Sequence, residues 1–136
     1  MAFIQWNDRL KLNITICDEQ HKKLIEIINS LHETYKSAKD KDVTSKTIED
    51  LMAYTQYHFK TEEDLFDKYN YPYSTRHKIE HAELTNQVAA YSKRFGNGES
   101  VSISELLSFL KDWVNDHIIG SDRNYAPFLR SKGYTN

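Results

Sequence analysis

Apolar residues recur at steps of three and four along most of the chain, which is the spacing of amphipathic α-helices. The first such stretch is expected to run from about Asp18, as its N-cap, to about Ala38. The polar segment Lys39-Asp40-Lys41-Asp42 is expected to form a turn before a second helix that ends near Tyr69. Asn70-Tyr71-Pro72 stops that helix, because the residue before a proline is disfavoured in the helical conformation.

The second half of the chain predicts two more helices. Ser74 can cap a third helix, and Gly96-Asn97-Gly98 is a strong break after it. Ser102-Ile103-Ser104-Glu105 has the form of a capping box, so it is expected to open a fourth helix. Short connections favour antiparallel neighbours. The predicted fold is therefore all-α, an up-down-up-down four-helix bundle with an N-terminal arm of about a dozen residues that packs Trp6 across it.

Composition narrows the class of protein. With 136 residues the chain suits one domain, so residues 1–136 are treated as a single unit. A formal net charge of −2, with 18 Lys and Arg against 20 Asp and Glu, argues against nucleic-acid and membrane-surface partners. No apolar stretch approaches the roughly 20 residues that span a bilayer. The single cysteine, Cys17, and an N-terminus without the pattern of a secretory signal make the cytoplasm the expected compartment.

The histidines are the chemically informative residues. A single histidine on an apolar helix face is more often a hydrogen-bonded core residue than a metal ligand. However, His58 and Glu62 are four residues apart, and so are His77 and His81. Each of these two pairs therefore projects from one face of its helix. Counting about 1.5 Å of rise per residue along antiparallel helices brings six side chains together near one end of the bundle. They are His21, His58, Glu62, His77, His81 and His117.

Two further residues test this arrangement. His32 lies eleven positions after His21, about 16 Å further along the axis, so it is expected on the flank and outside the cluster. Asp122 lies five positions after His117, about 140° around a regular helix. Gly120 permits a wide turn or a break that would bring Asp122 back to the cluster. The alternative is that Gly120 is a plain C-cap and that Asp122 is solvated.

Five imidazoles with two carboxylates and no thiolate cluster are too many donors for one tetrahedral ion. They favour two first-row metal ions such as iron or manganese over structural zinc. Two dications bridged by two carboxylates and one hydroxide carry a formal charge of about +1. A di-ferric oxo centre that holds a hydroperoxide carries about the same charge. Such a centre could therefore take up dioxygen with no net change in buried charge.

These residues resemble the hemerythrin family in its bacterial single-domain form, over nearly the whole chain. The matching segments are Asp18-Glu19-Gln20-His21, His58-Phe59 with Glu62, Tyr71-Pro72 with His77 and His81, Trp113 with His117, and Gly120-Ser121-Asp122 before Tyr125-Ala126-Pro127-Phe128. The resemblance implies a di-iron centre with these ligands: His77, His81 and His117 on one iron, His21 and His58 on the other, and Glu62 and Asp122 as bridges. The second iron would have the open position where dioxygen binds as hydroperoxide.

Residues beside the ligands are expected to form the wall of the oxygen pocket: Leu24, Ile28, Phe59, Trp113, Val114 and Ile118. Their other interpretation is ordinary core, and both can hold, because an apolar wall also excludes water and protons. Cys17 stands where the family more often has an aliphatic side chain. It is expected to be a small buried hydrophobe, with a redox-active thiol as the alternative.

Two classes of function are compatible with this site. The first is reversible dioxygen binding for storage, delivery or sensing, with any oxygen-consuming partner enzyme left unidentified. The second is a di-iron enzyme with peroxidase, oxidase or nitric oxide reductase activity. Enzymatic di-iron bundles more often use Glu-x-x-His pairs and four or more carboxylates, so the histidine-rich set favours a binding protein over an enzyme. Iron storage or a structural metal site fits poorly, because no acidic entry path is evident.

Overall fold

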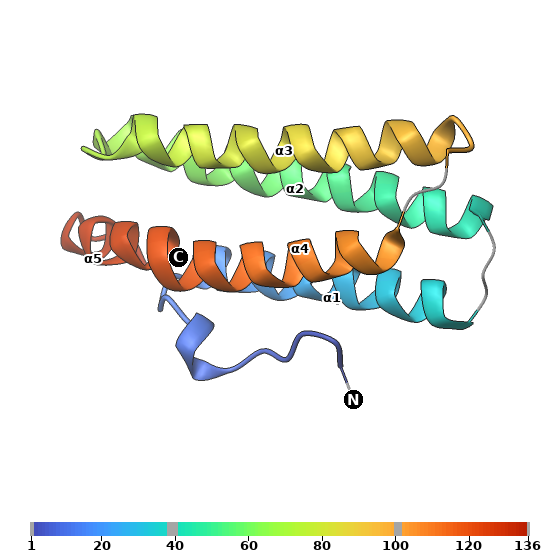
Figure 1. The fold of residues 1–136 in the computed structure, drawn as a ribbon. Helices are drawn as coiled ribbons and strands as arrows, with labels where there is room; N and C mark the ends of the chain where they lie inside the picture. Colours follow the sequence, from blue (N-terminus) through green and yellow to red (C-terminus); the bar gives the residue numbers. More distant parts are fainter. Residues whose placement is uncertain (1, 38–40, 100–101, 136) are drawn as a thin grey trace.

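The computed structural model describes residues 2–37, 41–99 and 102–135, and within them the secondary structure is entirely helical. The elements are a short helix η1 (Asp8–Leu10), α1 (Thr15–Ser37), α2 (Lys41–Tyr69), α3 (Ser74–Gly96), α4 (Ile103–Asp116), a π-helix η2 (His117–Asp122) and α5 (Arg123–Ser131). In Figure 1, α1 to α4 alternate in direction, with α2 and α3 paired above α1 and α4. The predicted up-down-up-down bundle is confirmed.

The starts of α1 and α2 differ from the expected ones. α1 begins at Thr15, so Asp18 lies inside the helix and is not its N-cap. Its carboxylate instead accepts backbone hydrogen bonds from Leu12 (2.8 Å) and Asn13 (3.0 Å), which stabilises the loop before the helix. α2 already includes Lys41 and Asp42, so the expected turn was too long, and residues 38–40 lie outside the described part.

The helices of the second half begin with different caps. Ser74 is the first residue of α3, and the N-cap position belongs to Tyr73, which makes no side-chain cap hydrogen bond. The prediction that Ser74 caps this helix was therefore wrong. The fourth helix follows the prediction, since the Ser102 hydroxyl accepts a hydrogen bond from the Glu105 backbone N–H at 3.1 Å.

The N-terminal arm packs across the bundle as expected, below α1 and α4 in Figure 1. The Asn29 amide on α1 binds both backbone groups of Ile4: its oxygen accepts from the Ile4 N–H (2.8 Å) and its nitrogen donates to the Ile4 carbonyl (2.9 Å). Phe3 stacks on His32 with ring centroids 4.5 Å apart, and the Lys22 ammonium lies over the Trp6 ring. These contacts attach an irregular segment to α1.

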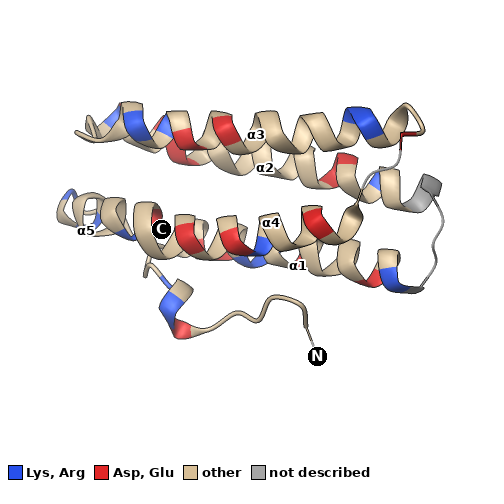
Figure 2. Cartoon of the chain, in the orientation of Figure 1, with Lys and Arg blue, Asp and Glu red and all other residues tan. Residues whose placement is uncertain are grey.

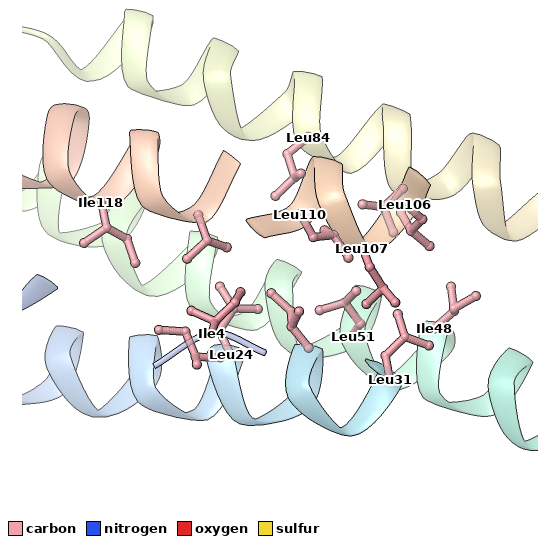
Figure 3. Packing of buried hydrophobic residues seen from close by; sticks show 14 of the residues in the cluster. Ile4, Leu24, Leu31, Ile48, Leu51, Leu84, Leu106, Leu107, Leu110 and Ile118 are labelled. Carbon is pink, nitrogen blue, oxygen red and sulfur yellow. The ribbon is translucent and has the colours of Figure 1, made fainter. Parts of the chain in front are cut away.

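The buried apolar residues form two clusters. The larger one fills the middle of the bundle, where Leu24, Leu31, Leu84 and Leu110 converge in Figure 3. The smaller one lies toward α5 and includes Cys17, Phe66 and Tyr125, together with Leu12, Ile14, Leu65, Tyr71, Ala126 and Leu129. Each of α1 and α2 contributes to both clusters. A layer of buried polar residues lies between them.

Charged residues of both signs occur along the helices in the view of Figure 2, in agreement with the near-balanced composition. Within the described part of the chain, none of the helices combines the length and the apolar character needed to cross a membrane.

Candidate metal centre

The structure brings all seven predicted site residues into one buried cluster. Each is at most 5% exposed, and Glu62 and Asp122 are fully buried. Ligand atoms that lie within 4.8 Å of one another form two overlapping groups. The three-histidine group contains His77, His81 and His117, the two-histidine group contains His21 and His58, and both contain Glu62 and Asp122. The carboxylates therefore lie between two sets of imidazoles, the arrangement expected of bridging ligands.

Asp122 reaches the cluster because the chain is a π-helix from His117 to Asp122. The wider turn compensates for the five-residue spacing, and Asp122 Oδ1 lies 3.0 Å from His117 Nε2. The alternative of a solvated Asp122 is thus wrong. Gly120, however, has no positive φ, and no atom lies within 4 Å of a Cβ added there. The wide turn therefore does not depend on the conformational freedom of glycine.

The contacts across the cluster join imidazole nitrogens to carboxylate oxygens. Asp122 lies 2.9 Å from His21 Nε2 and 3.0 Å from the Nε2 atoms of His77 and His117. Glu62 Oε1 lies 3.1 Å from His81 Nε2 and 3.5 Å from His58 Nε2. Two ligands at right angles on one ion, each about 2.1 Å from it, are about 3.0 Å apart. The observed separations match those of neighbouring ligands on shared ions.

The polar atoms that face the centre of the cluster have no hydrogen bonds. Among the described residues, the buried side-chain atoms without a partner include the Nε2 atoms of His21, His77, His81 and His117, Glu62 Oε1 and both oxygens of Asp122. Leaving one such atom unpaired costs about 1–3 kcal/mol, so this many at one place require a common partner. Metal ions would supply that partner, and the donor set of imidazoles and carboxylates suits first-row ions such as iron.

Three residues that the sequence reasoning missed determine which nitrogen of three histidines carries the proton. The Nδ1 atoms of His58, His81 and His117 pair with side-chain oxygens of Gln20 (2.7 Å), Glu63 (2.8 Å) and Glu80 (3.0 Å) respectively. Carboxylate and amide oxygens only accept, so Nδ1 donates, and Nε2 is the nitrogen left to bind a metal once any proton on it is displaced. Gln20 and Glu63 adjoin His21 and Glu62 in sequence, but no periodic signal indicates which histidine each would contact.

Tyr125 is a further residue at the cluster that the sequence did not indicate. Its side chain is fully buried, and its hydroxyl donates a hydrogen bond to Glu62 Oε2. Burial together with the negative charge of Glu62 raises the pKa of Tyr125, which keeps the hydroxyl protonated as a donor. Cys17 lies in the same apolar cluster, and burial strongly raises the pKa of its thiol. A buried, protonated thiol supports the interpretation of Cys17 as a small hydrophobe.

The electrostatics of the metal-free cluster depend on the balance of burial and charge. Burial lowers the pKa of His58 to about 4. Burial acts in the same direction on His21 and His117, but Asp122 and Glu62 outweigh it and raise their pKa values to about 10 and about 9. Protons on these two imidazoles would then balance the two carboxylates. Binding of metal ions must displace these protons.

A narrow gap, too small for the centre of a water-sized molecule, adjoins the cluster. Five of the six residues expected in the oxygen pocket line it: Leu24, Phe59, Trp113, Val114 and Ile118. Ile28 is not among the lining residues. It is buried in the larger apolar cluster, one turn beyond Leu24 on α1, and therefore acts as core. His32 also follows the prediction, because it packs against the arm and is absent from both metal-ligand groups.

Aromatic rings hold two of the imidazoles in place. Phe59 stacks on His81 with ring centroids 3.7 Å apart and planes 6° from parallel. Trp113 stacks on His117 at 4.1 Å and 14°. Each of these histidines is therefore held by a hydrogen bond at Nδ1 and by a ring on its face, which limits its rotation.

The bundle and its buried cluster of histidines and carboxylates define a class of metal-binding helical domains, and comparison with known proteins identifies the family. Residues 12–129 match the domain family described as "Hemerythrin HHE cation binding domain". The chain belongs to the hemerythrin family, and members of this family bind a di-iron centre.

Relatives and solved structures agree with this assignment. A bacteriohemerythrin of Stenotrophomonas maltophilia (strain R551-3) is 36% identical over 131 residues, which cover 96% of this chain and 84% of that one. A bacteriohemerythrin of Methylococcus capsulatus (strain ATCC 33009 / NCIMB 11132 / Bath) is 32% identical and covers 95% and 98% of the two chains. A crystal structure of wild-type hemerythrin superposes with a TM-score of 0.87 at 31% identity, over 93% of this chain and 97% of that chain.

Proposed function

We propose that the cluster holds two iron ions and that the centre binds dioxygen reversibly. The observation that carries the proposal is the convergence of partnerless imidazole and carboxylate atoms in two overlapping groups, within a hemerythrin-family bundle. His77, His81 and His117 would hold one iron, and His21 and His58 the other. Glu62 and Asp122, which belong to both groups, would bridge them.

When bound, the iron pair supplies the electrons that dioxygen needs to bind as a reduced species. The protein contributes a ligand set with the required tautomers, because Gln20, Glu63 and Glu80 keep protons on the outer nitrogens of three histidines. It also contributes the apolar wall around Leu24, Phe59 and Ile118, which keeps water and protons away from the bound gas.

The narrow gap favours gas binding over catalysis on an organic substrate. It has no room for the centre of a water-sized molecule, far from the roughly 300–1,000 Å³ typical of small-molecule sites. Its size does not separate dioxygen from hydrogen peroxide or nitric oxide. A peroxidase or nitric oxide reductase is therefore the alternative that the experiment must address.

The test is an anaerobic titration of the reduced, iron-loaded protein with dioxygen, followed by removal of the gas. We expect close to two irons per chain, charge-transfer bands that appear with oxygen, and return of the colourless di-ferrous spectrum under argon. One tightly held zinc with no iron, or oxidation that argon does not reverse, would contradict the proposal. Rapid turnover with peroxide, well above that of adventitious iron, would favour the enzyme.

Storage, delivery to an oxygen-consuming enzyme and sensing all require the same reversible binding. The cytoplasmic location and the absence of a nucleic-acid partner likewise stay predictions from composition.

A further inference from the structure

The hydrogen-bond partners of the histidines differ in charge between the two metal-ligand groups. In the three-histidine group, His81 Nδ1 pairs with the Glu63 carboxylate at 2.8 Å and His117 Nδ1 with the Glu80 carboxylate at 3.0 Å. In the two-histidine group, His58 Nδ1 pairs at 2.7 Å with the neutral amide oxygen of Gln20. His21 Nδ1 has no hydrogen-bond partner among the described residues.

The amide orientation of Gln20 is well determined. Its nitrogen Nε2 donates to the Thr61 hydroxyl at 3.2 Å, and Thr61 in turn donates to the Tyr57 carbonyl at 3.2 Å. Because the amide nitrogen is already engaged, the oxygen of Gln20 must face His58. The partner of His58 is therefore a neutral acceptor.

The two carboxylates are equally well placed on the other side. Glu80 on α3 also accepts a hydrogen bond from the Ser121 hydroxyl at 2.6 Å, which holds it between α3 and the π-helix. Glu63 is half-buried and follows the bridging candidate Glu62 directly on α2. Two negative charges thus lie one imidazole away from the three-histidine group.

A carboxylate at Nδ1 makes the imidazole a stronger electron donor through Nε2. Its negative charge also stabilises a ferric ion more than a ferrous ion, since the interaction scales with the charge of the ion. A neutral amide only weakly increases the electron donation of the imidazole, and it has no net charge with which to stabilise a ferric ion. The surroundings of the two irons should therefore differ in the oxidation state that they favour.

We propose, on the basis of the proposed di-iron function, that Glu63 and Glu80 are positioning residues that make the three-histidine iron the more easily oxidised of the two. Gln20 would leave an iron held by His21 and His58 with weaker electron donors. An iron held by His77, His81 and His117 would then be the first of the pair to lose an electron.

The experiment measures the reduction potential of the iron-loaded protein in charge-neutralising variants. Glu63→Gln and Glu80→Gln keep the size and an acceptor oxygen but remove the charge, and both should shift the potential upward and slow autoxidation. Gln20→Glu adds a charge on the other side and should shift the potential downward and accelerate autoxidation. Glu83→Gln is the matched control, because Glu83 lies exposed on α3, one turn from Glu80. It should match the unmodified protein.

A second measurement locates the oxidised ion. One equivalent of ferricyanide removes one electron from the di-ferrous protein, and Mössbauer spectroscopy then distinguishes the ferric from the ferrous site. We expect the ferric ion at the three-histidine site in the unmodified protein, and a weaker preference in a Glu63→Gln/Glu80→Gln double variant. A purely structural role of the two residues would change iron affinity, by about 10–100-fold, without this redistribution.

The outcomes separate this proposal from the proposed function. The inference would be overturned if the reduction potentials of Glu63→Gln and Glu80→Gln equalled that of Glu83→Gln. Dioxygen binding would then remain intact. An iron pair that shows the predicted potentials but no reversible oxygen binding would overturn only the proposed function. A chain that takes up no iron pair would overturn both. If one glutamine variant fails to fold, the other variant and Gln20→Glu still decide the question.

Discussion

At the scale of single residues, the surroundings of both ring nitrogens separate a histidine of the cluster from a flank histidine. His81 has a carboxylate at Nδ1 and a partnerless Nε2 that faces the cluster, whereas His32 stacks on Phe3 in the arm. The same residue type on the same kind of helix therefore has two different roles.

Replacement of single site residues should separate these roles. His77→Ala and Glu62→Ala should lose iron, because each removes a buried donor and leaves neighbouring polar atoms without a partner, at about 1–3 kcal/mol of stability for each such atom. His32→Ala should keep the full iron content. Metal analysis of the purified variants measures this, and equal iron loss in all three would show that proximity in the cluster does not decide ligation.

The pH dependence of the metal-free protein follows from the buried imidazoles. The folded pKa of His58 is lowered to about 4 from 6.5, so its contribution to stability is present above pH 6.5 and is lost as the pH falls toward 4. The pKa values of His21 and His117 are raised, so their contribution is present below pH 6.5 and is lost as the pH rises through about 9 to 10.

The metal-free protein should therefore be most stable near pH 6.5, as urea unfolding from pH 4.5 to 9 can measure. Iron binding should show the opposite trend above pH 7, because it displaces the protons and tightens as they become easier to remove. A metal-free stability that rises steadily from pH 7 to 9 would contradict the protonated state of His21 and His117.

At the scale of elements, the π-helix from His117 to Asp122 is the feature that completes the cluster. It widens the turn by one residue and so returns Asp122 to the face of His117. Gly120 in its middle faces open space and has no positive φ. The bundle packing and the contacts of Asp122 therefore hold the wide turn in place, rather than the glycine.

Gly120→Ala should consequently be tolerated and should stabilise the protein by about 0.4–1 kcal/mol, since it restricts the unfolded chain without strain in the folded one. Asp122→Ala should instead lower the iron content and weaken the magnetic coupling of any remaining pair. Chemical denaturation and Mössbauer spectroscopy measure the two effects. Loss of iron in Gly120→Ala would show that the glycine itself is needed for the wide turn.

The N-terminal arm depends on one side chain for its attachment. Asn29 satisfies both the N–H and the carbonyl of Ile4, so Asn29→Ala should leave both without a partner and cost about 1–3 kcal/mol. The matched control is Asn86→Ala, at an exposed position of α3. Urea unfolding curves of both variants measure the difference. Equal stabilities would show that the apolar contacts of the arm suffice to hold it.

At the scale of the whole molecule, the polar layer between the two apolar clusters links metal binding to folding. The unfolded chain has no preformed site, so iron binds the folded state and stabilises it by about 1.4 kcal/mol for each tenfold excess over its dissociation constant. The iron-loaded protein should therefore unfold at a higher temperature than the metal-free protein in calorimetry. Equal unfolding temperatures would mean that the cluster contributes to the fold without metal.

The four-helix bundle and the level of the ligands along it could be predicted from the sequence. Both follow from local rules, because the period of apolar residues predicts the helices, short connections make neighbours antiparallel, and a fixed rise per residue places His21, His77 and His117 near one end. The i, i+4 spacing of His58 and Glu62 likewise requires no tertiary information.

Only the tertiary structure decided how these residues are held. Contacts between side chains of different helices decided three features that the sequence did not predict. They are the start of α1 at Thr15, the core position of Ile28, and the contacts of Glu80 with His117 and Ser121. Residues such as Glu80 carry no periodic signal, because a charged side chain on a helix flank looks the same in sequence whether it faces water or a ligand. The sequence alone thus predicted the candidate ligands and their level along the bundle, and packing decided which nitrogens of the histidines donate hydrogen bonds and which charges lie beside them.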